Sequence, residues 1–150
     1  GEFGFGQCTH DRTSYVTRDS ATDYIGTTAW LAGITAGVYM ALMGPQGIKE
    51  VGETIMQRRE YAQQLLDTVK GVDARRFSAP SFKEFVVDFN GTGKTVKDIN
   101  AALLQKGIFG GKDLSGEYPE LGQCALYCVT EIHSAEDIER LYKAMEEVVR

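Results

Sequence analysis

The sequence has few of the residues that most often build catalytic or metal sites. Only two histidines and three cysteines occur among its 150 residues, and no serine–histidine–acid or cysteine–histidine set stands out. An odd number of cysteines outside a small secreted framework indicates reduced thiols and a cytoplasmic location. From the residues alone we assign no catalytic residue.

Metal sites are not favoured either. Cys8 with His10, or Cys124 and Cys128 with His133, do not show the short paired spacings that close a zinc site. In a strand, Cys124 and Cys128 would point to the same face, so we expect both to be ordinary core cysteines and predict no metal.

Positive charge is scarce as well. Lysine and arginine total 16 against 21 acidic residues, which gives a net charge of -5 and a pI of about 5.1. This balance argues against a nucleic-acid partner, which needs a basic face. No basic patch precedes an apolar run at the start of the sequence, so a secretory signal peptide is not expected. The 43% of hydrophobic residues fits a soluble globular domain with a real core.

A long segment without charge extends from Tyr24 to Ile48. Its length would allow a membrane span, but glycines and threonines dilute its hydrophobicity and no aromatic–basic flanks frame it. We therefore expect no membrane insertion and a helical arm that is buried on most sides. If its covering partner is removed, the arm should self-associate or expose apolar surface.

The remaining residues fall into an arm and a small domain. Residues 1–23 carry little periodicity and are expected to form a loose lead-in, of which Gly1-Glu2-Phe3 is the kind of sequence that a cloning site leaves. Residues 24–150 predict a long helical arm, interrupted at Gly44-Pro45, and then a β-β-α-β-α unit of the α/β (α+β) class. The expected elements are a helix that ends near Gly71, strands around Phe77 and over 82–89, a helix from a Thr95 cap to Gly107, a strand over 126–129 and a helix capped by Ser134.

Three features leave alternatives open. Residues 91–95, GTGKT, look like the tail of a phosphate-binding loop, but Asp88 replaces the required first glycine, so a polar turn into the next helix is favoured. Glu131 follows a strand end and is either a functional carboxylate or a loop hydrogen-bond acceptor. Tyr118, followed by Pro119, either lines a pocket or belongs to a loop that the proline stiffens.

The order of several short motifs resembles a known family. Residues 108–141 read IFGGKDLSGEYPELGQCALYCVTEIHSAEDIERL, residues 43–53 read MGPQGIKEVGE, and residues 81–89 read SFKEFVVDF. This set is similar to the C-terminal part of the first subunit of the glycine cleavage system P-protein, a fold-type-I pyridoxal-phosphate enzyme. The similarity extends over nearly all of residues 12–150.

The resemblance implies a fold, a cofactor and partners. The chain would supply the arm and small domain of a subunit within a heterotetramer, whose second subunit carries the Schiff-base lysine. The intact enzyme would decarboxylate glycine with pyridoxal phosphate and pass the aminomethyl group to the lipoyl arm of the H-protein. The fragment alone would bind no cofactor and be inactive, and Tyr118 and Glu131 would face a site that other chains complete.

Thr22 is the position that the resemblance connects with the cofactor. In related enzymes a threonine just before the arm helix reaches the cofactor phosphate of the neighbouring subunit, and Thr22 matches it together with Arg18 and Ile25. Asp23-Tyr24 departs from the family's Ser-Asn, and an aspartate beside a phosphate is repulsive. This departure leaves open a divergent fold-type-I aminotransferase or lyase subunit. A further alternative is a stand-alone ferredoxin-like binding module, which the predicted β-β-α-β-α order without a catalytic set favours.

Overall fold

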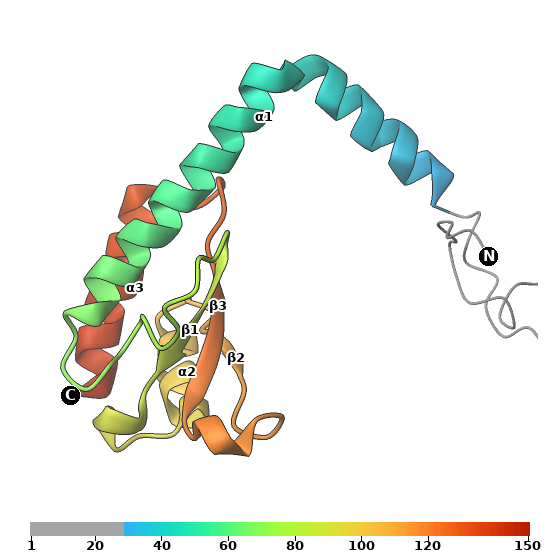
Figure 1. The fold of residues 1–150 in the computed structure, drawn as a ribbon. Helices are drawn as coiled ribbons and strands as arrows, with labels where there is room; N and C mark the ends of the chain where they lie inside the picture. The colour runs from blue at the N-terminus through green and yellow to red at the C-terminus, as the bar shows by residue number, and fades with distance from the viewer. Residues whose placement is uncertain (1–28) are drawn as a thin grey trace, which may run out of the picture. The chain divides into compact units, whose positions relative to one another are not determined.

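The structure is a computed structural model that describes residues 29–150, drawn as a ribbon in Figure 1. The chain divides into two compact units, Gly1–Ile48 and Lys49–Arg150. The elements along the chain are α1 (Trp30–Asp67), β1 (Glu84–Asp88), the 3-10 turn η3 (Asn90–Thr92), α2 (Val96–Gln105), β2 (Lys112–Asp113), the 3-10 turn η4 (Pro119–Leu121), β3 (Cys124–Cys128) and α3 (Ala135–Val149).

Helix α1 consists of two helical segments that meet at Gly44. Gly44 has φ 63° and ψ 177°, a backbone conformation that is not helical and that favours glycine. Pro45 follows and has no N–H to donate to the preceding turn. The predicted interruption at Gly44-Pro45 is therefore confirmed, although helix geometry resumes at once on its far side.

The strands form one antiparallel sheet in the order β1-β3-β2. Glu84 pairs with Cys128 and Asp88 with Cys124 along β1 and β3, and Lys112 pairs with Leu126 along β2 and β3. The combination of helices with a small antiparallel sheet confirms the predicted α/β class.

The predicted β-β-α-β-α order needs a correction, because the observed order after α1 is β-α-β-β-α. The strand expected around Phe77 is absent from the described chain: Phe77 is 55% exposed and lies in an irregular segment before Pro80. Only Asp73 makes an isolated bridge there, to Asp88. The short strand β2 was not predicted, because two residues are too few to show an alternating pattern.

The core lies on one face of the sheet. Alternate residues of β1 and β3 point to that face, where Phe85, Val87, Ala125 and Tyr127 are buried. Helices α2 and α3 and the second half of α1 cover it, and Figure 1 shows α3 beside this half of α1. The largest fully buried side chains are Phe89, Leu66, Ile99, Leu103, Met145, Val87, Val96 and Cys124.

Helix caps were predicted well. Thr95 accepts the N–H of Asp98 at 3.1 Å at the start of α2. Ser134 and Asp137 make the reciprocal pair of a capping box at the start of α3. At the end of α2, Gly107 has φ 70°, and the N–H of Ile108 reaches the carbonyl of Leu103 at 3.0 Å, as in a Schellman motif.

The two cysteines of β3 differ, contrary to the expectation that both belong to the core. Cys124 is buried, whereas Cys128 is exposed. Both lie on the sheet face opposite Phe85 and Tyr127. Burial raises the pKa of the Cys124 thiol above its usual value.

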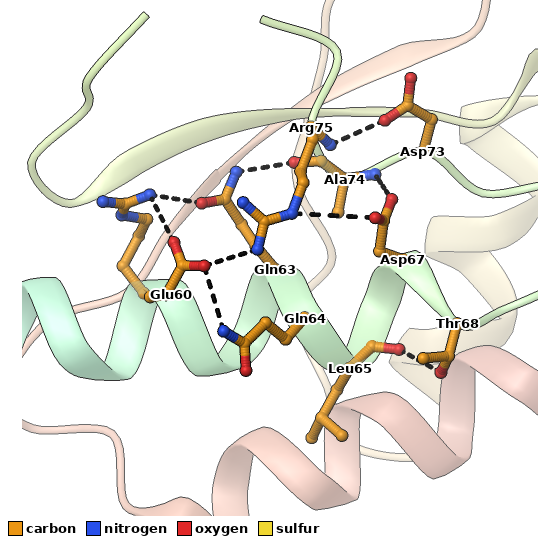
Figure 2. A network of polar contacts seen from close by, with 10 residues as sticks. Glu60, Gln63, Gln64, Leu65, Asp67, Thr68, Asp73, Ala74 and Arg75 are labelled. Carbon is orange, nitrogen blue, oxygen red and sulfur yellow. Dashed lines mark hydrogen bonds and ion pairs between the residues drawn. The ribbon is translucent and has the colours of Figure 1, made fainter. Parts of the chain in front are cut away.

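A polar network attaches the second half of α1 to the segment that leads to β1 (Figure 2). Arg75 contacts Glu60 at 2.5 Å and Asp67 at 3.8 Å. The buried amide of Gln63 donates to the Ala74 carbonyl at 2.7 Å, and the Ala74 N–H donates to Asp67 at 3.2 Å. The hydrogen bond with Arg75 lowers the pKa of the Glu60 carboxyl. These side-chain contacts hold the segment that the sequence suggested was a strand.

Candidate functional site

Glu131 lies in the turn between β3 and α3. Its backbone carbonyl accepts a hydrogen bond from the Arg58 side chain of α1. The Thr130 N–H donates to His133 Nδ1 at 3.0 Å within the same turn. The Glu131 side chain is exposed, and among residues 29–150 its carboxylate has no hydrogen-bond or ion-pair partner. The turn therefore presents a free carboxylate to whatever covers it.

A groove of about 360 Å³ lies beside this turn. Phe109 is 90% exposed and Ile132 is 78% exposed, and both line the groove. The other lining residues are Gly107, Ile108, Tyr127, Cys128, Val129, His133, Asp137, Ile138, Arg140 and Leu141. Two exposed apolar side chains at one groove are suited to contact with another apolar surface.

The two charged side chains of the groove, Asp137 and Arg140, are occupied by local structure. Asp137 belongs to the α3 capping box, and its hydrogen bonds with Ser134 lower the pKa of its carboxyl. Arg140 donates to the carbonyls of Lys106 and Gly107 at 2.8 and 3.2 Å. Cys128 and His133 also line the groove, and within residues 29–150 no hydrogen bond joins them.

Tyr118 lies at the other end of β3. Its N–H donates to the Leu114 carbonyl at 2.8 Å, its side chain is 48% exposed, and Pro119 begins η4 beside it. Because β3 rises about 3.3 Å per residue, its five residues separate the Tyr118 loop from Glu131 by on the order of 13 Å. The structure does not bring Tyr118 and Glu131 together. Thr22, the predicted cofactor contact, lies outside the described residues.

Close packing explains why residues 110 and 111 are both glycine. A Cβ on Gly111 would lie 2.5 Å from the Tyr127 ring, and a Cβ on Gly110 would lie 1.9 Å from Asn100 Oδ1. The Asn100 amide donates to the Gly111 carbonyl at 2.8 Å. Burial raises the pKa of Tyr127 to about 12, so its phenol stays neutral at ordinary pH. The pair allows the loop to approach β3 closely.

The GTGKT segment forms the expected polar turn. Two N–H groups at the start of α2 are already bonded: Val96 donates to Gln123 Oε1 at 2.9 Å, and Asp98 donates to Thr95. The Lys94 ammonium donates to the Val148 carbonyl. A phosphate-binding loop would need such donors to be free, so the turn serves to begin a helix.

Within residues 29–150, no three histidine, cysteine, aspartate or glutamate side chains lie closely enough together to hold a metal ion. In the same part of the chain, no helix is sufficiently long and apolar to cross a membrane.

Sequence reasoning missed the groove residues and Arg58. Phe109 stands beside Ile108, which packs against the core, and an apolar pattern alone does not separate the exposed residue from the packed one. Arg58 is 73 positions from Glu131, so no local spacing could connect them. Phe109 directly precedes the Gly110-Gly111 pair, and this order is the sequence signal that could have found the groove.

Comparison with known proteins places the chain in a family. A family model described as "Glycine cleavage system P-protein" matches residues 4–145. The chain is 34% identical over 149 residues to "Probable glycine dehydrogenase (decarboxylating) subunit 1" of Staphylothermus marinus, covering 99% of this chain and 32% of that protein. It is 39% identical over 141 residues to the protein of the same description from Desulforamulus reducens, covering 94% of this chain and 31% of that protein.

A solved structure agrees with the sequence comparisons. The crystal structure of glycine decarboxylase (P-protein) of the glycine cleavage system, in inhibitor-bound form, matches with a TM-score of 0.75 and 30% identity, covering 94% of this chain and 31% of that chain. The chain thus spans about a third of the length of the relatives that it matches. Because the family model covers nearly the whole sequence, the chain belongs to the glycine cleavage system P-protein family.

Proposed function

We propose that the chain is part of a first subunit of a two-subunit P-protein that decarboxylates glycine and passes the aminomethyl group to the lipoyl arm of the H-protein. The match of residues 4–145 to the family carries the proposal, and relatives described as subunit 1 support a second subunit as partner. Pyridoxal phosphate would supply the electron sink for the decarboxylation.

Three of the described lysines do not fit as the Schiff-base residue for that cofactor. A Schiff-base lysine needs an amine whose charged form is disfavoured by its surroundings. Here Lys106 pairs with Glu147 and Lys94 donates to a backbone carbonyl. Lys112 lies 2.7 Å from Glu117, and this contact raises the pKa of its ammonium. In keeping with what the family resemblance implies, we propose that the second subunit supplies the lysine and that this chain is inactive alone.

The candidate site residues receive separate roles in this proposal. Glu131, beside the apolar groove, faces the site that other chains complete. Tyr118 lines a different part of the enzyme, because it lies at the opposite end of β3. Thr22 contacts the cofactor phosphate of the neighbouring subunit, and Asp23 weakens that contact through charge repulsion.

A chimeric enzyme tests the proposal. This chain would replace the matched segment of the Desulforamulus reducens first subunit, which would be produced together with its second subunit. We expect glycine decarboxylation by the chimera, and neither imine absorbance nor decarboxylation when the 150-residue chain is mixed alone with pyridoxal phosphate. Activity of the isolated chain would contradict the proposal, and so would a folded chimera that assembles without activity toward glycine.

A second candidate function rests on Asp23-Tyr24, which replaces the family's Ser-Asn. In this alternative the subunit belongs to an enzyme that acts on a different amino acid. Assaying the chimera on a panel of amino acids separates the two functions, because the alternative requires turnover of another amino acid in preference to glycine. Reverting Asp23 to serine and Tyr24 to asparagine should then restore the preference for glycine.

A further inference from the structure

The turn between β3 and α3 is closed by two hydrogen bonds between the same two residues. The Thr130 N–H donates to Nδ1 of the His133 ring at 3.0 Å, and the His133 N–H donates to the Thr130 carbonyl at 3.3 Å. Glu131 and Ile132 lie between them, so this pair holds the part of the backbone that carries the Glu131 carboxylate. We call residues 130–133 the His133 turn.

The first of these hydrogen bonds depends on the protonation state of the His133 ring. A backbone N–H can only donate, so Nδ1 must be without a proton to accept it. The neutral ring then has its proton on Nε2, whereas the imidazolium has a proton on both nitrogens. Histidine is the residue whose side-chain charge ordinarily changes between about pH 5 and 8. Protonation of His133 would therefore place two donors against each other and break the hydrogen bond from Thr130.

The protonated ring has another acceptor within reach. The Thr130 hydroxyl oxygen lies 3.4 Å from His133 Nδ1, and a hydroxyl oxygen can accept from an imidazolium N–H. A small movement of the ring exchanges the Thr130 N–H for the Thr130 hydroxyl, and the backbone N–H then loses its ring acceptor. The turn thus has two hydrogen-bonding arrangements that differ by one proton.

Charged groups of both signs surround the His133 turn. The described titratable and charged residues that line the groove with the ring, or contact its turn, are Asp137 and Arg140 of α3, Tyr127 and Cys128 of β3, Arg58 of α1 and Glu131 itself. The pKa of the Asp137 carboxyl is lowered first by its hydrogen bonds with Ser134 and then by the charge that His133 can carry. Asp137 attracts the protonated ring, whereas the two arginines repel it.

We propose that the His133 turn is a pH-sensitive switch, in which neutral His133 positions the Glu131 carboxylate and protonated His133 releases it. His133 is then a positioning residue, which acts on Glu131 through the backbone of the turn. Arg58 holds the Glu131 carbonyl and stays charged over this pH range, so the turn opens at Thr130 and remains attached to α1. The effect on activity rests on the proposed function, in which Glu131 faces the site that other chains complete.

The Thr130 amide measures the closing hydrogen bond directly. Its chemical shift and its hydrogen exchange would be followed by nuclear magnetic resonance in the 150-residue chain between about pH 5 and 8. We expect the amide to be protected at the upper end of this range. As the pH falls, its protection should decrease severalfold relative to a His133→Asn variant at the same pH, and its chemical shift should move with it.

His133→Asn is the matched variant, because its Oδ1 is bonded to Cγ as Nδ1 is in histidine. This oxygen accepts a hydrogen bond throughout the pH range, so the turn should stay closed in acid. His133→Leu offers no acceptor, and its Thr130 amide should be unprotected at every pH. His10→Asn changes the other histidine of the sequence and should respond to pH as the unmodified chain does.

The chimeric first subunit, assembled with its second subunit, tests the effect on activity. Because other groups of the enzyme also titrate, the rate of glycine decarboxylation by the His133→Asn chimera is divided by that of the unmodified chimera at each pH. We expect this ratio to rise severalfold as the pH falls from about 8 to 5. A merely structural role of His133 would give a ratio that does not depend on pH.

Two results would overturn the inference. One is a Thr130 amide that responds to pH equally in the unmodified chain and in His133→Asn. The other is an active chimera whose rate ratio stays constant with pH. An inactive chimera with a pH-dependent Thr130 amide that His133→Asn abolishes would reject the proposed function and keep the switch. An active chimera with a pH-independent Thr130 amide would do the reverse.

Discussion

The two halves of helix α1 differ in what covers them. After Gly44 the helix is amphipathic: Ile55, Ala62 and Leu66 are buried in the core of its own unit. Before Gly44 the helix has neither a charged face nor a buried one. The comparison shows that both sequences form a helix, whereas only the amphipathic half contributes side chains to the core of its own unit.

The largest expected difference between the two regions concerns core truncation. Phe89 is fully buried and packs near Tyr127, so Phe89→Ala should destabilise the unit by about 3–5 kcal/mol. Leu42→Ala lies in the first half of α1, residues 30–43, which we call the arm helix. It should change the free energy of unfolding by less than about 0.5 kcal/mol. Urea unfolding followed by circular dichroism measures both. A large effect at Leu42 would mean that the arm helix packs within this chain.

Adding one methyl group should have opposite effects in the two regions. Gly111→Ala places a Cβ against the Tyr127 ring and should cost about 1–3 kcal/mol of unfolding free energy. Gly33→Ala enters open space in a helix and should stabilise that helix by about 0.5–1 kcal/mol. Urea unfolding measures the effect of Gly111→Ala, and the helix content from circular dichroism measures the effect of Gly33→Ala. Gly116→Ala, another open position, is the control. Equal losses of stability from Gly33→Ala and Gly111→Ala would contradict the prediction.

The start of α3 contrasts with the start of the arm helix, which has no acidic residue in its first turn. Ser134→Ala removes the capping box and should cost about 1 kcal/mol, whereas exposed Ser78→Ala should be nearly neutral.

Asp137 adds a pH dependence to this cap. Its hydrogen bonds with Ser134 hold the pKa of its carboxyl below the ordinary value of 3.8 in the folded state. Its contribution is therefore present above about pH 3.8 and is lost as the pH falls through the lower, folded pKa. Asp137→Asn should lower stability at pH 7 and have little effect in stronger acid. If Asp137→Asn were less stable than the unmodified chain by the same amount at all pH values, the stabilising role of the ionised Asp137 carboxylate would be contradicted.

The smallest expected effect is that of the charged network on the second half of α1. Arg75 contacts Glu60 and Asp67 at the surface, so Arg75→Met should cost at most about 1 kcal/mol, because exposed ion pairs contribute little. The loss should shrink at high salt. Lys49→Met, which removes a looser pair with Glu53 at 3.7 Å, should be closer to neutral. A larger effect at Lys49 than at Arg75 would reverse the expected ranking.

Local signals in the sequence predicted local structure reliably. The caps at Thr95 and Ser134 and the break at Gly44 depend on residues within one turn, and the structure confirms all three. The strand expected at Phe77 was wrong, because contacts from α1 hold that segment in place of a strand ladder. The two residues of β2 pair only because β3 lies beside them.

The candidate site depended more strongly on distant contacts. The order of motifs identified the family from the sequence, and the family model matches residues 4–145. The separation of Tyr118 from Glu131, and the meeting of Glu131 with Arg58, follow from how β3 is placed in the sheet. No periodic pattern in the sequence predicts where β3 lies in the sheet.

The sequence by itself thus determined the class of fold, the family, the helix ends and an arm helix without charge. These follow from short-range hydrogen bonding, from side-chain periodicity and from the order of motifs. Only the tertiary structure decided which apolar residues are covered: Phe89 and Tyr127 are buried, whereas Phe109 and the arm helix are not. Burial is a property of neighbours that are distant in the chain, and the same apolar side chain contributes to a core or to a docking surface according to which neighbours are present.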